Sequence, residues 1–258
     1  MSRLDNKTIL ITGASSGIGK STAYEFAKVA KVKLILGARR LPTVEEIAKD
    51  LHSKYSVSVL PIKLDVSDLE SIPKVIENLP KDFADIDVLV NNAGLAIGVD
   101  RVKDLKVDDA VRMMTTNVLG LMAMTRAILP LYYKKGKGDI VNVGSIAGRE
   151  SYPGGSVYCS TKSAVAQFTS ALRKETIDTG IRVMEVDPGQ VETEFSMVRY
   201  SGDHEKAGNV YKGYEPLIPE DIAEVIVFTV SRRPSVVIAD TLVFPNQQAG
   251  SYHLYKQA

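Results

Sequence analysis

Short apolar stretches rich in β-branched residues alternate along this chain with longer amphipathic stretches. Buried parallel strands have the first character, because both of their faces are covered. We expect strands at residues 7–12, 33–37, 57–64, 87–90, 139–143, 181–186 and 236–244. We expect helices at residues 20–30, 43–55, 68–79, 108–133, 157–179 and 219–231. This alternation predicts an α/β fold, a Rossmann-type doubly wound parallel sheet of seven strands with helices on both faces.

A single domain accounts for residues 1–258, since the chain contains no linker, low-complexity stretch or short-period repeat. Residues 190–218 depart from the alternation, because they have few periodic apolar positions and contain Gly202, Gly208 and Gly213. A long irregular insert beside a site is typical of a lid. Ligands of open parallel sheets bind outside the carboxyl ends of the strands. We therefore expect residues 190–218 to cover a site at that edge.

Composition and charge narrow the range of partners. The net charge is +1, so neither nucleic acid nor an anionic membrane is expected as a partner. No uninterrupted apolar run is long enough to span a bilayer, and residues 1–7 are polar, unlike a signal peptide. The single cysteine, Cys159, rules out an internal disulfide and suits a reducing compartment. We expect a cytoplasmic protein, with the nucleus as an alternative location, that acts on small molecules.

A glycine-rich turn follows the first expected strand. Glycines let backbone N–H groups and a helix N-terminus approach a pyrophosphate closely. The spacing G-x-x-x-G-x-G differs from the usual G-x-G-x-x-G fingerprint, but its strand–turn–helix context favours a dinucleotide over a turn without a ligand. The residues expected to contact the dinucleotide here are Gly13, Ser15, Ser16, Gly17, Ile18 and Gly19.

The end of the second strand distinguishes the two nicotinamide dinucleotides. Enzymes that use NAD place an Asp or Glu here to bind the ribose 2′-OH. This chain has Ala38 followed by Arg39 and Arg40, and no acidic residue occurs before Glu45. A carboxylate repels a 2′-phosphate, whereas guanidinium groups bind it through paired hydrogen bonds. The sequence therefore predicts NADP as cofactor, against the alternative that both arginines are solvated loop charges.

Tyr158 and Lys162 are the strongest candidates for chemistry. They are four residues apart at the start of an expected helix, which puts them on one face. An ammonium beside a phenol lowers the phenol pKa from about 10, and such a tyrosine exchanges protons with alcohols or carbonyls. A shift to neutrality needs about 4 kcal/mol, so the site must be partly dry or hold a second cation. Ser145 can hold the reacting oxygen; alone, the Tyr/Lys pair would also fit a packed amphipathic turn.

With Asn91-Asn92-Ala93-Gly94, Asn117 and Pro188-Gly189 also in place, nearly the whole chain resembles the short-chain dehydrogenase/reductase superfamily. The resemblance implies the catalytic set Asn117, Ser145, Tyr158 and Lys162. In this set Tyr158 exchanges the proton and Ser145 orients the substrate oxygen. Lys162 binds the nicotinamide ribose and lowers the pKa of Tyr158, with the oxidised nicotinamide as the second cation. Asn117 holds a water that connects Lys162 to solvent.

The resemblance also implies further contacts along the cofactor and an assembly. Adenine contacts come first, then the ribose region, then the nicotinamide end, where Tyr158 and Lys162 take part. The implied residues, in that order, are Asp65, Val66, Asn91, Asn92, Ala93, Gly94, Pro188, Gly189, Val191 and Thr193. The long helices expected at 108–133 and 157–179 carry more apolar surface than one sheet face buries, and related enzymes pair through them. We therefore expect a homotetramer, or at least a dimer.

A closer resemblance is to NADP-dependent 3-hydroxy acid dehydrogenases, which oxidise serine and allo-threonine at the β-hydroxyl. It implies a small 3-hydroxy acid substrate such as serine, allo-threonine or 3-hydroxyisobutyrate. A buried carboxylate needs a cationic partner. We prefer Arg199, which lid closure could deliver over the substrate, to Arg149 just beyond Ser145. The segments that carry this resemblance are LGARR (36–40), GSIAGR (144–149), VETEFS (191–196), VRY (198–200) and DTL (240–242).

Two alternative functions stay open. The same catalytic set could serve a carbonyl reductase that acts on small ketones or aldehydes without a carboxylate. A non-catalytic dinucleotide-sensing regulator is the alternative of another class, but it would not need Ser145, Tyr158 and Lys162 together. No metal is expected, because the three histidines lack the spacing of metal ligands.

Overall fold

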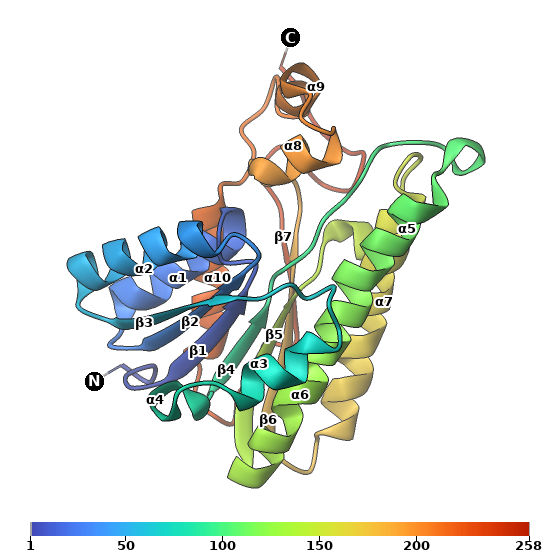
Figure 1. The fold of residues 1–258 in the computed structure, drawn as a ribbon. Coiled ribbons are helices and arrows are strands. Elements are labelled where there is room, and N and C mark those ends of the chain that lie inside the picture. The colour runs from blue at the N-terminus through green and yellow to red at the C-terminus, as the bar shows by residue number, and fades with distance from the viewer. Residues whose placement is uncertain (1, 258) are drawn as a thin grey trace.

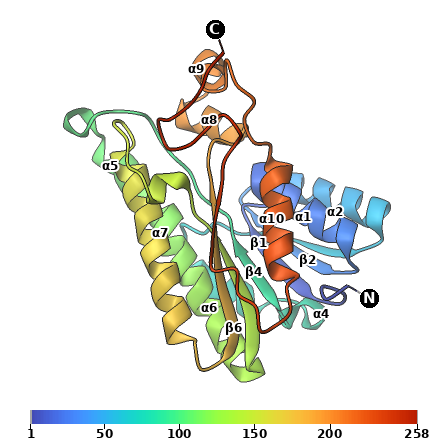
Figure 2. The same cartoon turned by 180° about the vertical axis from the view of Figure 1, so that it is seen from behind.

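Residues 2–257, which the computed structural model describes, are organised around one parallel sheet (Figures 1 and 2). The strand order is β3-β2-β1-β4-β5-β6-β7, so the chain winds outward in two directions from β1 and β4. This doubly wound arrangement confirms the expected fold class. The strands are β1 (Thr8–Thr12), β2 (Lys33–Ala38), β3 (Ser58–Lys63), β4 (Val88–Asn91), β5 (Lys137–Val143), β6 (Gly180–Pro188) and β7 (Asp240–Val243).

Helices cover both faces of the sheet (Figure 2). One face carries α1 (Gly17–Val29), α2 (Leu41–Tyr55) and α10 (Pro219–Val230). The other face carries α3 (Ser71–Glu77), α5 (Val107–Met114), α6 (Gly120–Lys135) and α7 (Ser156–Glu175). A short helix, α4 (Lys81–Ala84), precedes β4. Among the described residues, none of the helices has both the length and the apolar character needed to cross a membrane.

The strands divide the core into two layers. Ile9 and Ile11 of β1 pack on the side of α1, whereas Leu10 packs on the side of α3 and α6. Leu34 and Ile35 of β2 show the same division. Successive strand side chains point to opposite faces, so a strand covered on both faces reads as a continuous apolar run. The short apolar runs in the sequence are therefore the centre of the sheet.

The helix expected at 108–133 is interrupted by a π-helical turn. Residues Thr115–Leu119 form this turn between α5 and α6, and the three segments follow one another directly. A π turn inserts an extra residue into the helical repeat, and such turns are frequent at functional sites. Asn117 lies in the turn and is buried. The turn thus gives a polar side chain an inward position that a regular amphipathic repeat does not predict.

The segment 190–218 is more ordered than its sequence suggests. It contains two short helices, α8 (Glu194–Arg199) and α9 (His204–Asn209), which stand above the carboxyl edge of the sheet in Figure 1. Thr193 caps α8 by accepting a hydrogen bond from the Phe195 N–H at 3.1 Å. Each helix is too short to show an apolar repeat. The expectation of an irregular stretch was therefore wrong for these two turns. The strand expected at 236–244 is also shorter, since only its residues Asp240–Val243 pair with β6, as β7.

Candidate active site

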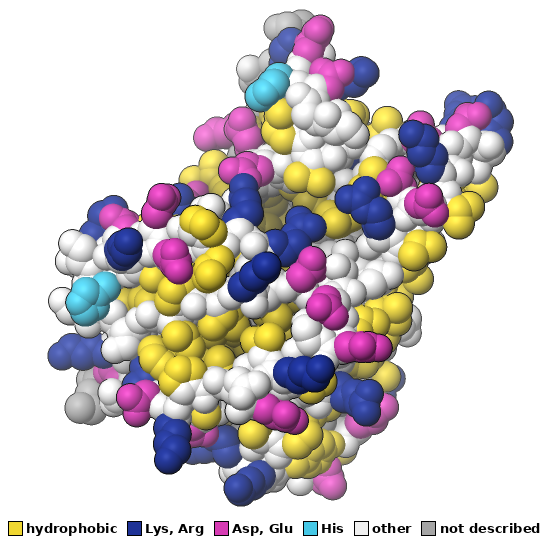
Figure 3. Space-filling view, viewed as in Figure 1, with side chains coloured by type: hydrophobic (Ala, Val, Ile, Leu, Met, Phe, Trp, Pro, Cys, Tyr) yellow, Lys and Arg dark blue, Asp and Glu magenta, His cyan; other side chains and the backbone are white. Residues whose placement is uncertain are grey.

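A cavity of roughly 750 Å³ opens at the carboxyl edge of the sheet. Gly13, Ala38, Asn92, Gly144 and Pro188, which follow or end five different strands, all line it. Figure 3 shows this side of the molecule hollowed below α8, with apolar side chains within the hollow and Lys and Arg side chains around it. Across residues 2–257, no group of His, Cys, Asp and Glu side chains is arranged to hold a metal ion.

The glycine-rich turn forms one end of the cavity. Gly13 and Gly17 have φ angles of +67° and +50°, a region that favours glycine. A Cβ on Gly13 would lie 2.9 Å from the Cα of Ala93, so the turn packs tightly against the end of β4. The N-terminus of α1 faces the cavity at Gly17, where free N–H groups and the helix dipole favour an anion. This cradle fits the pyrophosphate of a dinucleotide.

Gly19 does not line the cavity, although the motif suggested a contact there. A Cβ at this position would collide with the side-chain nitrogen of Asn92 and with the carbonyl oxygen of Gly13. The Asn92 side chain donates to the Thr12 carbonyl oxygen at 2.9 Å. Gly19 therefore permits close packing behind the turn, and Asn92 fixes the turn to β1. The other five residues expected in this turn do line the cavity: Gly13, Ser15, Ser16, Gly17 and Ile18.

Arg39 and Arg40 lie on the cavity wall beyond the glycine turn. The Arg40 guanidinium donates to the Ser15 hydroxyl at 3.1 Å and pairs with the Glu194 carboxylate at 3.1 Å. The two guanidinium groups fit a ribose 2′-phosphate, which bidentate donors bind well. Glu194 was not anticipated, because it reaches this place from the lid rather than from the second strand. A phosphate bound here would share Arg40 with Glu194.

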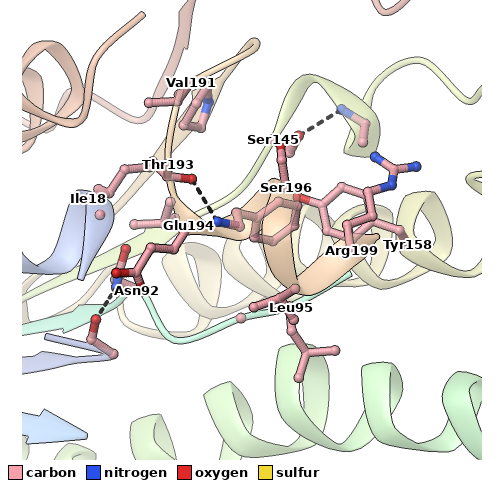
Figure 4. A pocket seen from close by; sticks show the side chains of 18 of the residues that line it. Ile18, Asn92, Leu95, Ser145, Tyr158, Val191, Thr193, Glu194, Ser196 and Arg199 are labelled. Atoms are coloured by element: carbon pink, nitrogen blue, oxygen red, sulfur yellow. Dashed lines mark hydrogen bonds between the residues drawn. The ribbon is translucent and has the colours of Figure 1, made fainter. Parts of the chain in front are cut away.

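Ser145, Tyr158 and Lys162 meet in the middle of the cavity, as expected. Ser145 follows β5, and its hydroxyl lies close enough to the Tyr158 phenol to lower the pKa of that group. Its hydroxyl also accepts from the Ala147 N–H at 3.1 Å, which caps a short turn at Ile146–Gly148. Figure 4 shows Ser145 and Tyr158 on one side of the cavity, with Ile18 and Asn92 toward the other.

Burial dominates the titration of the two catalytic side chains. It raises the pKa of Tyr158, and the Ser145 hydrogen bond and the Arg199 charge offset this only in part. Burial also lowers the pKa of Lys162 to about 8, against the carboxylates of Asp187 and Glu185, which raise it. The protein's own groups therefore do not produce the depressed pKa expected for Tyr158. The physical reason is that desolvation disfavours a phenolate more strongly than these neighbours stabilise it.

Asn117 and Asn91 lie behind the cavity rather than on its wall. The Asn117 amide accepts from the Leu95 N–H and donates to the Leu95 carbonyl oxygen, both at 2.8 Å. It also donates to the Thr161 hydroxyl at 3.1 Å, which links the π turn to α7. The Asn91 amide donates to the Thr125 hydroxyl at 3.0 Å, inside the core. Asn91 therefore makes no side-chain contact with the cavity, because strand alternation turns it away from the site.

The two candidate substrate arginines differ in position. Arg199 lines the cavity and donates to the Tyr152 hydroxyl at 3.1 Å. Its guanidinium carbon lies 6.0 Å from the centre of the Tyr158 ring. Arg149 does not line the cavity, because Asp187 holds it through contacts of 2.8 Å at Nε and 2.6 Å at Nη2. Of these two arginines, Arg199 faces the cavity, and Arg149 is a structural partner of Asp187.

The remaining predicted cofactor residues also line the cavity: Asp65, Val66, Ala93, Gly94, Pro188, Gly189, Val191 and Thr193. Tyr152 and Tyr252 also line it and were not anticipated. Their rings meet edge to face, with centroids 5.8 Å apart. Tyr152 could have been found from its place between Ser145 and Tyr158. Tyr252 carries no sequence signal, because the C-terminal segment reaches the cavity only through the fold.

A serine, a tyrosine and a lysine that share one cavity with a glycine-rich anion cradle define a nicotinamide-dependent oxidoreductase. Residues 7–204 match the family model for short chain dehydrogenase, and the chain belongs to this family. The family expected from the sequence is thereby confirmed.

Two relatives and one solved structure are similar over almost the whole chain. The NADP-dependent 3-hydroxy acid dehydrogenase of Schizosaccharomyces pombe is 77% identical over 257 residues, which cover 100% of this chain and 99% of that protein. Sulfoacetaldehyde reductase 2 of Chromohalobacter salexigens is 41% identical, over 94% of this chain and 96% of that protein. The closed form of serine dehydrogenase complexed with NADP+ is 35% identical with a TM-score of 0.88, over 96% of this chain and 99% of that one.

Proposed function

We propose that the protein is an NADP-dependent dehydrogenase of small 3-hydroxy acids such as serine, allo-threonine or 3-hydroxyisobutyrate. The observation that carries this proposal is the position of Arg199 beside Tyr158 in one cavity. A carboxylate on Arg199 would leave the β-hydroxyl of a short acid within reach of the phenol. The 77% identity to a protein named NADP-dependent 3-hydroxy acid dehydrogenase supports the same activity.

The catalytic roles follow from where the side chains lie. Bound NADP supplies the hydride acceptor. Tyr158, as phenolate, would take the proton of the substrate hydroxyl as the carbonyl forms. Ser145 would hydrogen-bond the same oxygen and keep it directed at Tyr158, since both side chains line the cavity. Lys162 would bind the nicotinamide ribose, and its ammonium lies 5.9 Å from the centre of the Tyr158 ring, where it adds positive charge. Asn117 holds α7 in register through Thr161, and a water relay to Lys162 stays a prediction.

The cofactor would occupy the cavity from the two arginines to the catalytic cluster. Arg39 and Arg40 would hold the 2′-phosphate, and the glycine turn with the α1 N-terminus would hold the pyrophosphate. Asp65 and Val66 would contact adenine. The remaining residues, toward the nicotinamide, are Asn92, Ala93, Gly94, Pro188, Gly189, Val191 and Thr193.

Reduction of small aldehydes or ketones is a second candidate. The relative named sulfoacetaldehyde reductase 2 favours it, at 41% identity. Arg199 could bind a sulfonate as it binds a carboxylate, since each presents charged acceptor oxygens to a guanidinium. The complete set of Ser145, Tyr158 and Lys162 argues against a purely regulatory dinucleotide sensor.

The proposal is tested by initial rates on a matched panel. Serine, allo-threonine and 3-hydroxyisobutyrate are each compared with their uncharged methyl esters, with NADP and with NAD. Sulfoacetaldehyde with NADPH tests the second candidate. We expect the acids to react faster than the esters and NADP to be preferred. Equal rates for acids and esters would exclude a carboxylate site, and a rate only with sulfoacetaldehyde would favour the second candidate.

We infer that the chains associate as homotetramers. Val107, Val111 and Met114 of α5 are 71%, 56% and 39% exposed. They form an apolar row of a kind that monomeric proteins rarely present to water. Phe228 of α10 and Leu242 of β7 are also exposed, by 50% and 39%. Light scattering that detects only a 28.1 kDa species would refute this. Cytoplasmic localisation, with the nucleus as an alternative, stays a prediction that microscopy of a tagged chain can test.

A further inference from the structure

Two buried carboxyl groups lie directly behind the catalytic serine. Glu185 and Asp187 are alternate residues of β6, so their side chains leave the same face of the strand. Each residue is only 2% exposed. Their carboxyl oxygens lie close together, since Asp187 Oδ1 and Glu185 Oε1 would both contact a Cβ placed on Gly144. Two carboxylates this close repel each other in a buried site, which favours a state in which one of the two carries a proton.

The carboxyl pair holds the backbone of the active-site loop. Asp187 Oδ1 accepts the Ser145 backbone N–H at 3.1 Å. Gly144 gives the pair the space to approach: a Cβ there would overlap Asp187 Oδ1 and lie 2.6 Å from Glu185 Oε1. Any larger residue at 144 would push the carboxyl groups away from the loop. The position of Ser145 is therefore set by the pair as well as by the end of β5.

The charges around the pair locate the proton. Arg149 engages Asp187 Oδ2 at 2.6 Å, which stabilises Asp187 as the carboxylate. Glu185 has no ion pair among residues 2–257; it faces Asp187 and Asp240, with Lys162 as the opposing cation. Burial, followed by the Asp187 charge, raises the pKa of Glu185 to about 8. At neutral pH the proton therefore lies on Glu185.

We propose that Glu185 and Asp187 form a proton-sharing pair that positions Ser145, with Glu185 acting through Asp187. Glu185 and Asp187 are positioning residues, and Ser145 is the group that touches substrate. Loss of the shared proton puts two negative charges behind Gly144, which drives the carboxyl groups apart and disturbs the Asp187 hydrogen bond to Ser145. Alcohol oxidation should then decline on the alkaline side, with an apparent pKa that belongs to the pair. The proposal relies on the proposed function only for the role of Ser145.

Lys162 is the competing source of an alkaline decline, since its pKa is about 8. Glu185→Gln separates the two causes. Glutamine still donates an N–H to Asp187 but does not titrate. If the pair causes the decline, the decline disappears in the variant. If Lys162 causes it, the decline moves to lower pH, because the Glu185 charge raises the pKa of Lys162 and the variant lacks it.

The experiment measures kcat against pH in the oxidising direction for the wild type, Glu185→Gln and Asp240→Asn, using any alcohol that the panel identifies. We expect the wild type to lose about tenfold per pH unit above the apparent pKa, and Glu185→Gln to keep its rate. Asp240→Asn, which removes a facing carboxylate without a hydrogen bond to Asp187, should keep the decline. An unchanged profile in Glu185→Gln, or one shifted to lower pH, overturns the proposal.

Infrared spectroscopy gives a readout that needs no substrate. The wild type and Asp240→Asn should show the C=O band of a buried protonated carboxyl group near pH 7, and Glu185→Gln should lack it. A wild-type protein without the band overturns the proposal, even if Glu185→Gln does not fold. Failure of every substrate in the panel would count against the proposed function alone, since the infrared result does not depend on turnover.

Discussion

The Lys162 ammonium lies beside the Tyr158 ring but makes no hydrogen bond to the Tyr158 hydroxyl. Its nitrogen is 5.9 Å from the ring centre and donates to the Val143 carbonyl oxygen at 2.8 Å. Burial favours the neutral form of each residue, raising the pKa of Tyr158 and lowering that of Lys162 to about 8. Oxidation requires the phenolate, so further positive charge must act on Tyr158, and an oxidised nicotinamide has that charge.

Tyr158→Phe should abolish most turnover while cofactor binding survives. The substitution keeps the ring, which packs against Phe195 at 5.6 Å between centroids, and removes only the hydroxyl. General acid/base catalysis supplies about 10²–10⁴ in rate, and a loss of that size is expected. Turnover and NADPH binding by fluorescence are measured side by side. A variant that keeps more than about a tenth of the wild-type turnover would contradict the role of Tyr158.

Lys162→Met should weaken cofactor binding and move the oxidation profile to higher pH. Removing the ammonium leaves Tyr158 with less positive charge, so the pKa of the phenol rises and the phenolate forms later. Oxidation rates, which increase with pH through that pKa, should therefore increase at higher pH in the variant. Lys162→Arg is the matched control for charge. The double variant with Tyr158→Phe should lose little more turnover than the worse single variant, because the two residues act as a unit.

Arg39→Ala/Arg40→Ala should raise the Michaelis constant for NADP. Losing a charge-assisted contact costs about 1.5–3 kcal/mol, which corresponds to roughly 10- to 150-fold. The constant for NAD should change far less, since NAD lacks the 2′-phosphate. Glu194→Gln is informative in the opposite sense: it frees Arg40 from its ion pair and should lower the constant for NADP. An unchanged NADP constant in the double alanine variant would show that the arginines are solvated loop charges.

Arg199→Gln should raise the Michaelis constant for 3-hydroxy acids by about 10- to 150-fold, the same range expected for one charge-assisted contact. The constant for the methyl esters should change little. Arg101→Gln, an exposed arginine outside the cavity, is the matched control. Equal effects on acids and esters would mean that Arg199 shapes the cavity through Tyr152 rather than binding the carboxylate.

The parts of the fold that follow from local patterns could be predicted from the sequence. The apolar runs identify the strands because both faces of the sheet are covered, and Gly13, Ser145 and Pro188 lie at strand ends in the sequence as in the structure. The spacing of Tyr158 and Lys162 on one helix also needs only local geometry. These features are set within a few residues, so they could be deduced without tertiary contacts.

The errors concern side chains whose surroundings come from elsewhere in the chain. Arg149 follows Ser145 closely, but Asp187 of β6 holds it outside the cavity. Asn91 and Asn92 are neighbours, yet strand alternation sends one into the core and the other to the glycine turn. Glu194 reaches Arg40 across 154 positions of sequence. A single sequence contains no local sign of such contacts.

Glu185 should make the folded protein less stable as the pH rises, an effect that a solvent-exposed glutamate does not have. Its pKa rises from the usual 4.5 to about 8 in the folded protein, so the folded state binds the proton more tightly than the unfolded chain does. The resulting stabilisation is complete below about pH 4.5 and is lost as the pH rises to about 8. Within that window the loss is about 1.4 kcal/mol per pH unit.

Denaturant unfolding of the wild type and Glu185→Gln near pH 5, 7 and 9 measures this effect. Glutamine does not titrate, so the variant should lack this loss. Its free energy of unfolding should therefore increase relative to that of the wild type as the pH rises. Glu45→Gln, which changes an exposed glutamate on α2, is the control and should follow the wild type at every pH. Parallel curves for the wild type and Glu185→Gln would mean that Glu185 is ionised in the folded protein, because only a proton held more tightly by the folded state makes the curves diverge.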